Sequence, residues 1–285
     1  MHVSHSYPGI TLGFSTQNFQ KALPLGVDNL KILLDFASEE GYNFMELRDP
    51  HADLSEEDCK ILADYAWKKR VEVIYEIHKD LFDPEFQEVF DRAIRNTSIF
   101  GEPGILRSIL SWSEFAAHKN KKGWTREELD YLTTTADSCA KLARVEDVQF
   151  VLENIIEPWS GNGETFGLTD FFDRTALVGL QFDTANPFLS SCRGQAEPES
   201  VANFLSSIPG KWLTTHLKCA AEDQFQPILK ENPLPYSRVF ELMEAGGVTY
   251  AALELMAVDG LDACKENHRK SIQYLSDINL VELPK

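Results

Sequence analysis

The sequence lacks the features that mark several large classes of protein. It has no run of about 18 apolar residues, which is the length that a membrane-spanning helix needs. No glycine-rich phosphate-binding motif of the GxGxxG or Walker type follows an apolar run, which argues against a nucleotide-binding protein. The five cysteines are scattered without a CxxC pair, a pattern typical of reduced thiols in a cytoplasmic protein.

Basic residues are scarce relative to acidic ones. Lys and Arg number 27 against 45 Asp and Glu, which gives a net charge of −18. Such a surface repels phosphate backbones and anionic membranes, so we expect neither a nucleic acid nor a membrane as a partner. The N-terminus shows neither a basic nor an apolar signal segment, which favours a cytoplasmic location. The oligomeric state stays open, and a homo-oligomer is compatible with the sequence.

The chain alternates short β-rich runs with helical patterns. Eight such units fit into residues 1–285, close to the roughly 250 residues of a (β/α)₈ barrel, so we predict one α/β domain of this TIM-barrel type. The predicted strands are 10–15, 43–48, 71–77, 104–110, 148–153, 178–183, 212–217 and 249–255. The predicted helices are 27–40, one capped by Ser55, 84–100, 125–143, 168–176, 198–207, 236–245 and 261–278. Residues 281–285 are expected to form a loose tail or an oligomer contact.

The last four predicted strands each carry, at or near the carboxyl end, a residue that can bind a hard divalent metal. These residues are Glu153, Asp183, His216 and Glu254, at intervals of roughly 30 to 40 residues, the length of one βα unit. Because barrel strands all open onto the same face, we expect the four side chains to converge. The sequence therefore predicts a metal site there.

The predicted ligand set contains three carboxylates, one imidazole and no thiolate. This set favours Mn²⁺, and Mg²⁺, Co²⁺ and Zn²⁺ are alternatives. An ionised carboxylate inside a barrel is unfavourable unless it is paired or binds a metal. An ion with four protein ligands retains room for two adjacent substrate oxygens, such as those of a hydroxy-ketone. The ion would polarise the carbonyl and stabilise the developing enediolate.

Four motifs contain these residues: Val-Leu-Glu153-Asn154, Gly-Leu-Gln-Phe-Asp183-Thr, His216-Leu-Lys218 and Leu-Glu254. With them the chain resembles, over nearly its whole length, the xylose isomerase-like TIM barrel superfamily and specifically its sugar phosphate isomerase/epimerase group. The resemblance implies that Glu153, Asp183, His216 and Glu254 are the metal ligands. It also implies that Glu153 and Glu254 act as acid and base on opposite faces of a sugar or polyol-derived substrate.

The activity implied by this resemblance is a divalent-metal-dependent isomerase or epimerase that transfers a proton next to a carbonyl. Two positions depart from the common pattern of the group. Asn186 stands where many members have His, and Cys219 stands where they commonly have Asp. Both changes leave the metal site plausible and leave the reaction open. A metal-dependent lyase or dehydratase acting on a keto-sugar or inosose-like substrate is therefore the alternative.

Five further residues are candidates for substrate binding, with a structural ion pair or an exposed position as the alternative for each. They are Glu46, His78, Arg107, Asn186 and Lys218. The other histidines show no ligand spacing and are expected on the surface. They are His2, His5, His51, His118 and His268.

Two other functions fit the sequence less well. An apurinic-site endonuclease would belong to another branch of the superfamily. It would have a His-rich site for several zinc ions and would have to bind DNA. Here the strand ends are poor in His, and the charge of −18 opposes DNA binding. A non-catalytic sugar-binding or scaffold protein would be favoured by loss of a ligand, and all four ligands are present.

Overall fold

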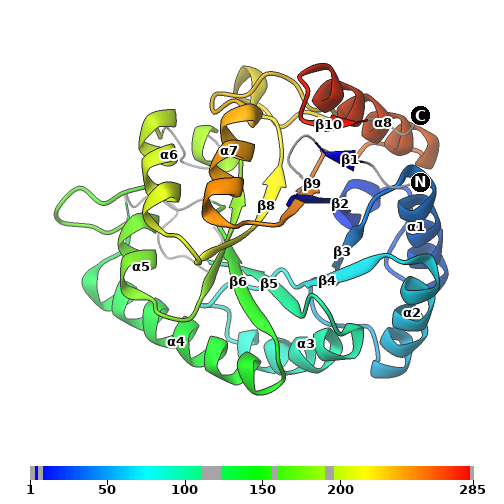
Figure 1. The fold of residues 1–285 in the computed structure, drawn as a ribbon. Coiled ribbons are helices and arrows are strands. Elements are labelled where there is room, and N and C mark those ends of the chain that lie inside the picture. Colours follow the sequence, from blue (N-terminus) through cyan, green and yellow to red (C-terminus); the bar gives the residue numbers. More distant parts are fainter. Residues whose placement is uncertain (1–3, 6–8, 111–122, 156–158, 190–195, 283–285) are drawn as a thin grey trace.

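A computed structural model describes residues 4–5, 9–110, 123–155, 159–189 and 196–282. Within them, eight parallel strands close into a barrel in the order β2 to β9, with helices around the outside (Figure 1). The barrel strands are β2 (Thr11–Ser15), β3 (Phe44–Arg48), β4 (Glu72–Glu76), β5 (Ile105–Ile109), β6 (Gln149–Glu153), β7 (Gly179–Asp183), β8 (Trp212–Leu217) and β9 (Tyr250–Leu253). The predicted (β/α)₈ barrel is thus confirmed.

Each barrel strand is followed by one α-helix before the next strand begins. The helices are α1 (Val27–Glu40), α2 (Glu56–Lys69), α3 (Phe86–Phe100), α4 (Arg126–Val145), α5 (Leu168–Arg174), α6 (Pro198–Ser207), α7 (Tyr236–Gly246) and α8 (Leu261–Asp277). Short 3₁₀ turns include η1 (Thr16–Phe19), η2 (Asn186–Phe188) and η4 (Ala221–Asp223). Among the described residues, none of the helices combines the length and apolarity that crossing a membrane requires.

Local signals set several helix boundaries. The Ser55 hydroxyl accepts a hydrogen bond from the backbone of Asp58, and the Asp58 carboxylate accepts one from the backbone of Ser55, which forms a capping box at the start of α2. Thr125 and Glu128 form the same arrangement at the start of α4. Gly41 ends α1 in the left-handed conformation (φ 83°) that glycine adopts without strain.

The barrel interior is built in two layers that follow from the two-residue period of a strand. The lower layer is an apolar cluster formed by Phe44, Ile74, Ile105, Val151 and Ala252. Two residues further along the same five segments, on the same face, lie Glu46, Glu76, Arg107, Glu153 and Glu254. The apolar layer therefore forms a floor under a layer of charged side chains.

The two ends of the described chain lie side by side. Strand β1 (Ser4–His5) pairs antiparallel with β10 (Val281–Glu282), next to α8 and α1 (Figure 1). The expectation of a loose tail is thus wrong for residues 281–282, because their backbone pairs with the N-terminal segment, and the alternative of an oligomer contact stays a prediction. Residues 283–285 lie outside the described residues.

His268 of α8 is buried, at 1% exposure, so its expected surface position is wrong. Its Nε2 lies 3.0 Å from Nδ2 of Asn18, and its Nδ1 lies 2.9 Å from the Tyr42 hydroxyl. The ring stacks on Phe19, with centroids 5.0 Å apart. Burial lowers the pKa of His268 to about 3, so the ring is neutral.

Of the other histidines expected on the surface, the side chain of His5 lies outside what the structure describes. His51 is exposed, as expected. His2 and His118 lie outside the described residues.

Candidate metal centre

The structure brings Glu153, Asp183, His216 and Glu254 together at the carboxyl end of the barrel. Glu153 and Asp183 are the last residues of β6 and β7, His216 lies one residue before the end of β8, and Glu254 directly follows β9. All four side chains are buried, and one potential ligand atom from each lies within 4.8 Å of the others. The convergence expected from the strand ends is therefore present in the fold.

His216 lies at the centre of this group with its two ring nitrogens facing different carboxylates. Nδ1 lies 3.1 Å from Oε1 of Glu153, 3.0 Å from Oε2 of Glu254 and 4.0 Å from Oδ2 of Asp183. Nε2 lies 2.6 Å from Oε2 of Glu46. Burial by itself would lower the pKa of His216, but the charges of Glu46 and Glu254 raise it to about 10.

Backbone groups fix the orientation of Asp183. Its Oδ1 accepts hydrogen bonds from the backbone N–H groups of Ala185 (2.7 Å) and Asn186 (2.8 Å). Its own N–H donates to Oδ1 of Asn154 over 2.8 Å. Oδ2 is consequently the oxygen that faces His216 and Lys218. Residues 182–186 thus direct Oδ2 of Asp183 toward the group of four converging side chains.

Two buried cations contact the proposed catalytic carboxylates. Arg107 forms an ion pair with Oε2 of Glu153 and also contacts Oε1 of Glu76 at 2.5 Å. Lys218 lies 2.7 Å from Oε2 of Glu254 and 3.3 Å from Oδ2 of Asp183. Although burial favours the neutral amine, the two carboxylates raise the pKa of Lys218. Glu153 therefore pairs with Arg107, and Glu254 pairs with Lys218.

Sequence reasoning missed Glu76 and Arg48, which extend this network on β4 and β3. Arg48 lies 2.7 Å from Oε1 of Glu76 and also donates to Oε1 of Gln17. Glu76 is fully buried, and Arg48 is half-buried at the barrel mouth. The sequence did contain a signal for both residues, since side chains two positions apart on a strand lie on the same face. Arg48 thus shares a face with Glu46, and Glu76 shares one with Ile74.

The connected charges do not balance without a further cation. The carboxylates in this network are Glu46, Glu76, Glu153, Asp183 and Glu254, and the fixed cations are Arg48, Arg107 and Lys218. Metal binding requires a neutral His216, and five ionised carboxylates would then face three positive charges in a buried site, which is unfavourable without the metal. A divalent ion among the three carboxylates and the imidazole would supply the two missing positive charges. The residues present thus fit a divalent metal.

The other predicted substrate-binding residues differ in what they contact. Oε1 of Glu46 accepts a hydrogen bond from Gln181, and Oε2 contacts His216. Asn186 donates through Nδ2 to the carbonyl of Asn154 over 2.7 Å. His78 is half-buried, and burial together with the charges of Arg48 and Arg107 lowers its pKa to about 2.

Cys219, the second position that departs from the pattern expected from the sequence resemblance, is not one of the four converging residues. It is fully buried, and its thiol donates to the carbonyl of Glu231 over 3.7 Å. The thiol group therefore takes part in packing after β8.

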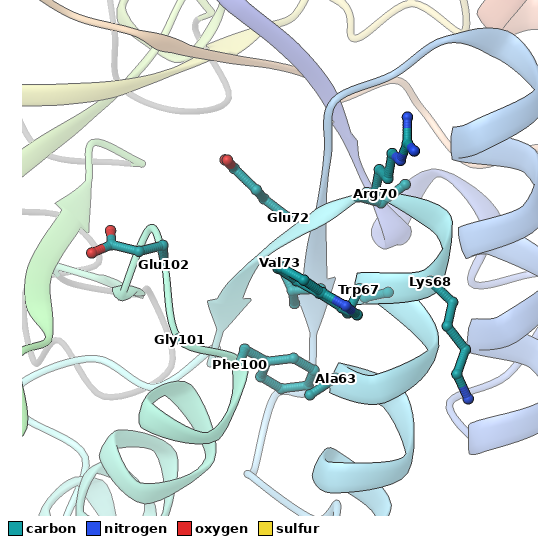
Figure 2. A pocket seen from close by; sticks show the side chains of 11 residues that line it. Ala63, Trp67, Lys68, Arg70, Glu72, Val73, Phe100, Gly101 and Glu102 are labelled. Carbon is teal, nitrogen blue, oxygen red and sulfur yellow. The ribbon is translucent and has the colours of Figure 1, made fainter.

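A hollow of about 900 Å³ lies on the opposite, amino-terminal side of the barrel. It is bounded by the end of α2, the start of β4 and the end of α3, with Trp67 and Phe100 in the middle and Lys68, Arg70, Glu72 and Glu102 around them (Figure 2). None of the four converging residues lines it. The hollow lies where β4 begins, whereas the charged layer lies toward the carboxyl ends of the strands, so the two are separate.

No protein-family model and no curated protein matches this sequence. Solved structures do match over nearly the whole chain. A xylose isomerase-like TIM barrel protein from Mycobacterium smegmatis in complex with magnesium has a TM-score of 0.63 at 17% identity, covering 97% of this chain and 99% of that one. The chain shares this fold. Two structures of sugar phosphate isomerase/epimerases from Parabacteroides distasonis match as well, with TM-scores of 0.67 and 0.59 at 13% identity, so the expected fold resemblance is confirmed.

Two further matches to this barrel carry named activities. A D-allulose 3-epimerase from Methylomonas sp. in complex with D-allulose has a TM-score of 0.68 at 11% identity, covering 97% of this chain and 99% of that one. The probable 3-DHS dehydratase AsbF from Bacillus anthracis has a TM-score of 0.65 at 14% identity, covering 94% and 99%. Likeness at these identities establishes the fold, and the reaction has to be argued from the residues.

Proposed function

We propose that this xylose isomerase-like barrel is a divalent-metal-dependent isomerase or epimerase of a sugar or sugar derivative. The observation that carries the proposal is the buried convergence of Glu153, Asp183, His216 and Glu254 above an apolar floor. Mn²⁺ is the proposed ion, and Mg²⁺, Co²⁺ and Zn²⁺ accept the same oxygen-rich donor set. The match to a magnesium complex of the same fold supports a bound divalent metal.

When bound, the ion would polarise the carbonyl of a hydroxy-ketone and stabilise negative charge that develops on it. Glu153 and Glu254 are the proposed acid and base at the neighbouring carbon. Ion pairs with Arg107 and Lys218 favour the ionised form of each, which suits the glutamate that removes the proton, whereas the other has to be protonated before it can return one. The Glu254 pKa is lowered far below its ordinary value, because Lys218 and His216 outweigh the opposing effect of burial.

The substrate would enter from the barrel mouth, where Arg48, His78 and Lys218 are the polar groups that we propose to contact its oxygens. The likeness to an epimerase that binds D-allulose supports a small sugar as the substrate. The apolar layer below the charged one keeps water from entering the site from beneath, which protects a carbanion-like species from random protonation.

The test combines metal analysis with turnover. Untreated protein is analysed for bound metals and then assayed with Mn²⁺ on a panel of ketoses and inosose-like ketones in D₂O. A proton-transfer isomerase or epimerase should place deuterium on the reacting carbon of the product. Complete retention of the substrate hydrogen would indicate a hydride shift instead. Protein that contains no divalent metal, gains none on incubation and turns over no ketone would overturn the proposal.

A lyase acting at the same site is the second candidate. The likeness to a dehydratase supports it. Both reactions begin with removal of a proton next to a carbonyl, and they differ in whether a hydroxyl group then leaves. Mass spectrometry of the same assay separates them, because an isomer keeps the substrate mass and a dehydratase product is lighter by one water.

A further inference from the structure

We infer that Glu46 is a positioning residue that orients His216 for metal binding, an inference that rests on the metal site proposed above. Oε2 of Glu46 lies 2.6 Å from Nε2 of His216, the ring nitrogen that faces away from the other three carboxylates. By accepting the proton of Nε2, Glu46 leaves the lone pair of Nδ1 directed at the centre of the proposed site.

The tautomer follows from what surrounds each nitrogen. An imidazole that binds a metal is neutral, with one N–H donor and one acceptor nitrogen. With the proton on Nδ1, the lone pair of Nε2 would face the Glu46 carboxylate at 2.6 Å, and both would be acceptors. With the proton on Nε2, that contact becomes a charge-assisted hydrogen bond, and Nδ1 faces Glu153 and Glu254 at 3.1 and 3.0 Å. A cation held between Nδ1 and these carboxylates satisfies every group.

Glu46 is itself held in place for this role. It projects from the middle of β3 into the barrel interior and is 1% exposed. Gln181 of β7 donates to its other oxygen, Oε1, over 3.0 Å. Both carboxylate oxygens are therefore engaged by protein side chains, which favours an orienting role over the substrate contact expected from the sequence. Carboxylate partners of metal-binding histidines commonly act in this way.

The experiment compares two isosteric variants, Glu46→Gln and Glu76→Gln. Each removes one negative charge from the same buried layer, but Glu76 contacts Arg48 and Arg107 and not His216. Mn²⁺ affinity is measured by competition with a chelator on the whole protein. We expect Glu46→Gln to weaken binding by about 10- to 100-fold, and Glu76→Gln to weaken it clearly less, because only the charge effect is common to both.

A second readout needs no variant. In protein labelled with ¹⁵N-histidine and loaded with diamagnetic Zn²⁺, NMR should show His216 protonated at Nε2 and metal-bound at Nδ1. The His216→Gln protein identifies the signal by its absence. A proton on Nδ1, or equal loss of affinity in the two Gln variants, would overturn the inference while leaving the metal site intact. Absence of metal binding by the unaltered protein would instead overturn the proposed function.

Discussion

Nζ of Lys218 lies 2.7 Å from Oε2 of Glu254, so an ammonium group contacts the same carboxylate that we propose as a metal ligand. The same ammonium is 3.3 Å from Oδ2 of Asp183 and lies over the Phe225 ring at 4.3 Å. A fixed positive charge at this place repels a divalent ion, although it also favours the ionised carboxylates that the ion needs.

Replacing Lys218 with Met should therefore tighten metal binding and reduce turnover. We expect Mn²⁺ affinity to increase by about tenfold, because removing one charge so close to the site relieves repulsion in a buried environment. The measurement is chelator competition together with kcat on the identified substrate. Lys211→Met, which removes a cation that contacts the backbone carbonyls of Phe172 and Thr175, is the control. An unchanged or lower affinity in Lys218→Met would contradict the prediction.

Removing a proposed ligand should remove the metal and the stability that it provides. In Asp183→Ala and His216→Ala, we expect loss of bound metal and loss of the metal-dependent rise in Tm, because an ion that binds only the folded state stabilises it. A chelator should lower the Tm of the unaltered protein in the same way. Asp130→Ala, at an exposed ion pair with Arg174, is the control and should keep the metal response. A Tm and an activity that chelation leaves unchanged would show that the site is not metallic.

Conservative replacement of either proposed acid–base residue should separate metal binding from proton transfer. Glu153→Gln and Glu254→Gln retain the size of the side chain and one oxygen ligand but lose the base. We expect the metal to be largely retained while kcat falls by about 10²–10⁴-fold, the usual contribution of a positioned acid or base. Metal content and steady-state kinetics of the two variants test this. Normal turnover in both would exclude the assignment of Glu153 and Glu254 as acid and base.

Stability should depend on pH through His268, whose partner Asn18 hydrogen-bonds the backbone of Leu253 and Leu255. Its pKa is lowered from an ordinary value of 6.5 to about 3 in the folded protein, so the unfolded chain binds the proton first as the pH falls. The stabilising contribution is therefore complete above pH 6.5 and is lost between pH 6.5 and pH 3, by up to about 1.4 kcal/mol per pH unit.

The pH effect is measured by denaturant unfolding of the unaltered protein and of His268→Gln across this range. The Gln variant retains hydrogen-bonding capacity toward Asn18 and Tyr42 but cannot titrate. It should be less stable at pH 7 and should lose stability with a shallower slope below pH 6.5. Parallel slopes in the two proteins would assign the acid sensitivity to other groups.

The sequence by itself determined the barrel and the four converging residues, since both follow from local periodicity. Alternating β runs and capped helices fix the βα repeat, and in a parallel barrel all strands end on one face. Glu153, Asp183, His216 and Glu254 were therefore predictable from their place at strand ends. The apolar floor under them also follows from the two-residue period, which places Val151 below Glu153 and Ala252 below Glu254.

Only the tertiary structure decided which side chains face one another across the barrel. Glu46 of β3 and His216 of β8 lie on strands that are not neighbours, and a contact of 2.6 Å between them depends on barrel closure and on side-chain rotamers. Arg107 differs, because it joins Glu76 and Glu153 from the two strands that pair directly with its own, and only its side-chain rotamer had to be decided by the tertiary structure. His268 shows most clearly what the sequence could not predict. It is buried because aromatic rings from distant segments, Phe14, Phe19 and Phe36, pack around it. Long-range packing of this kind leaves no periodic signal in the chain.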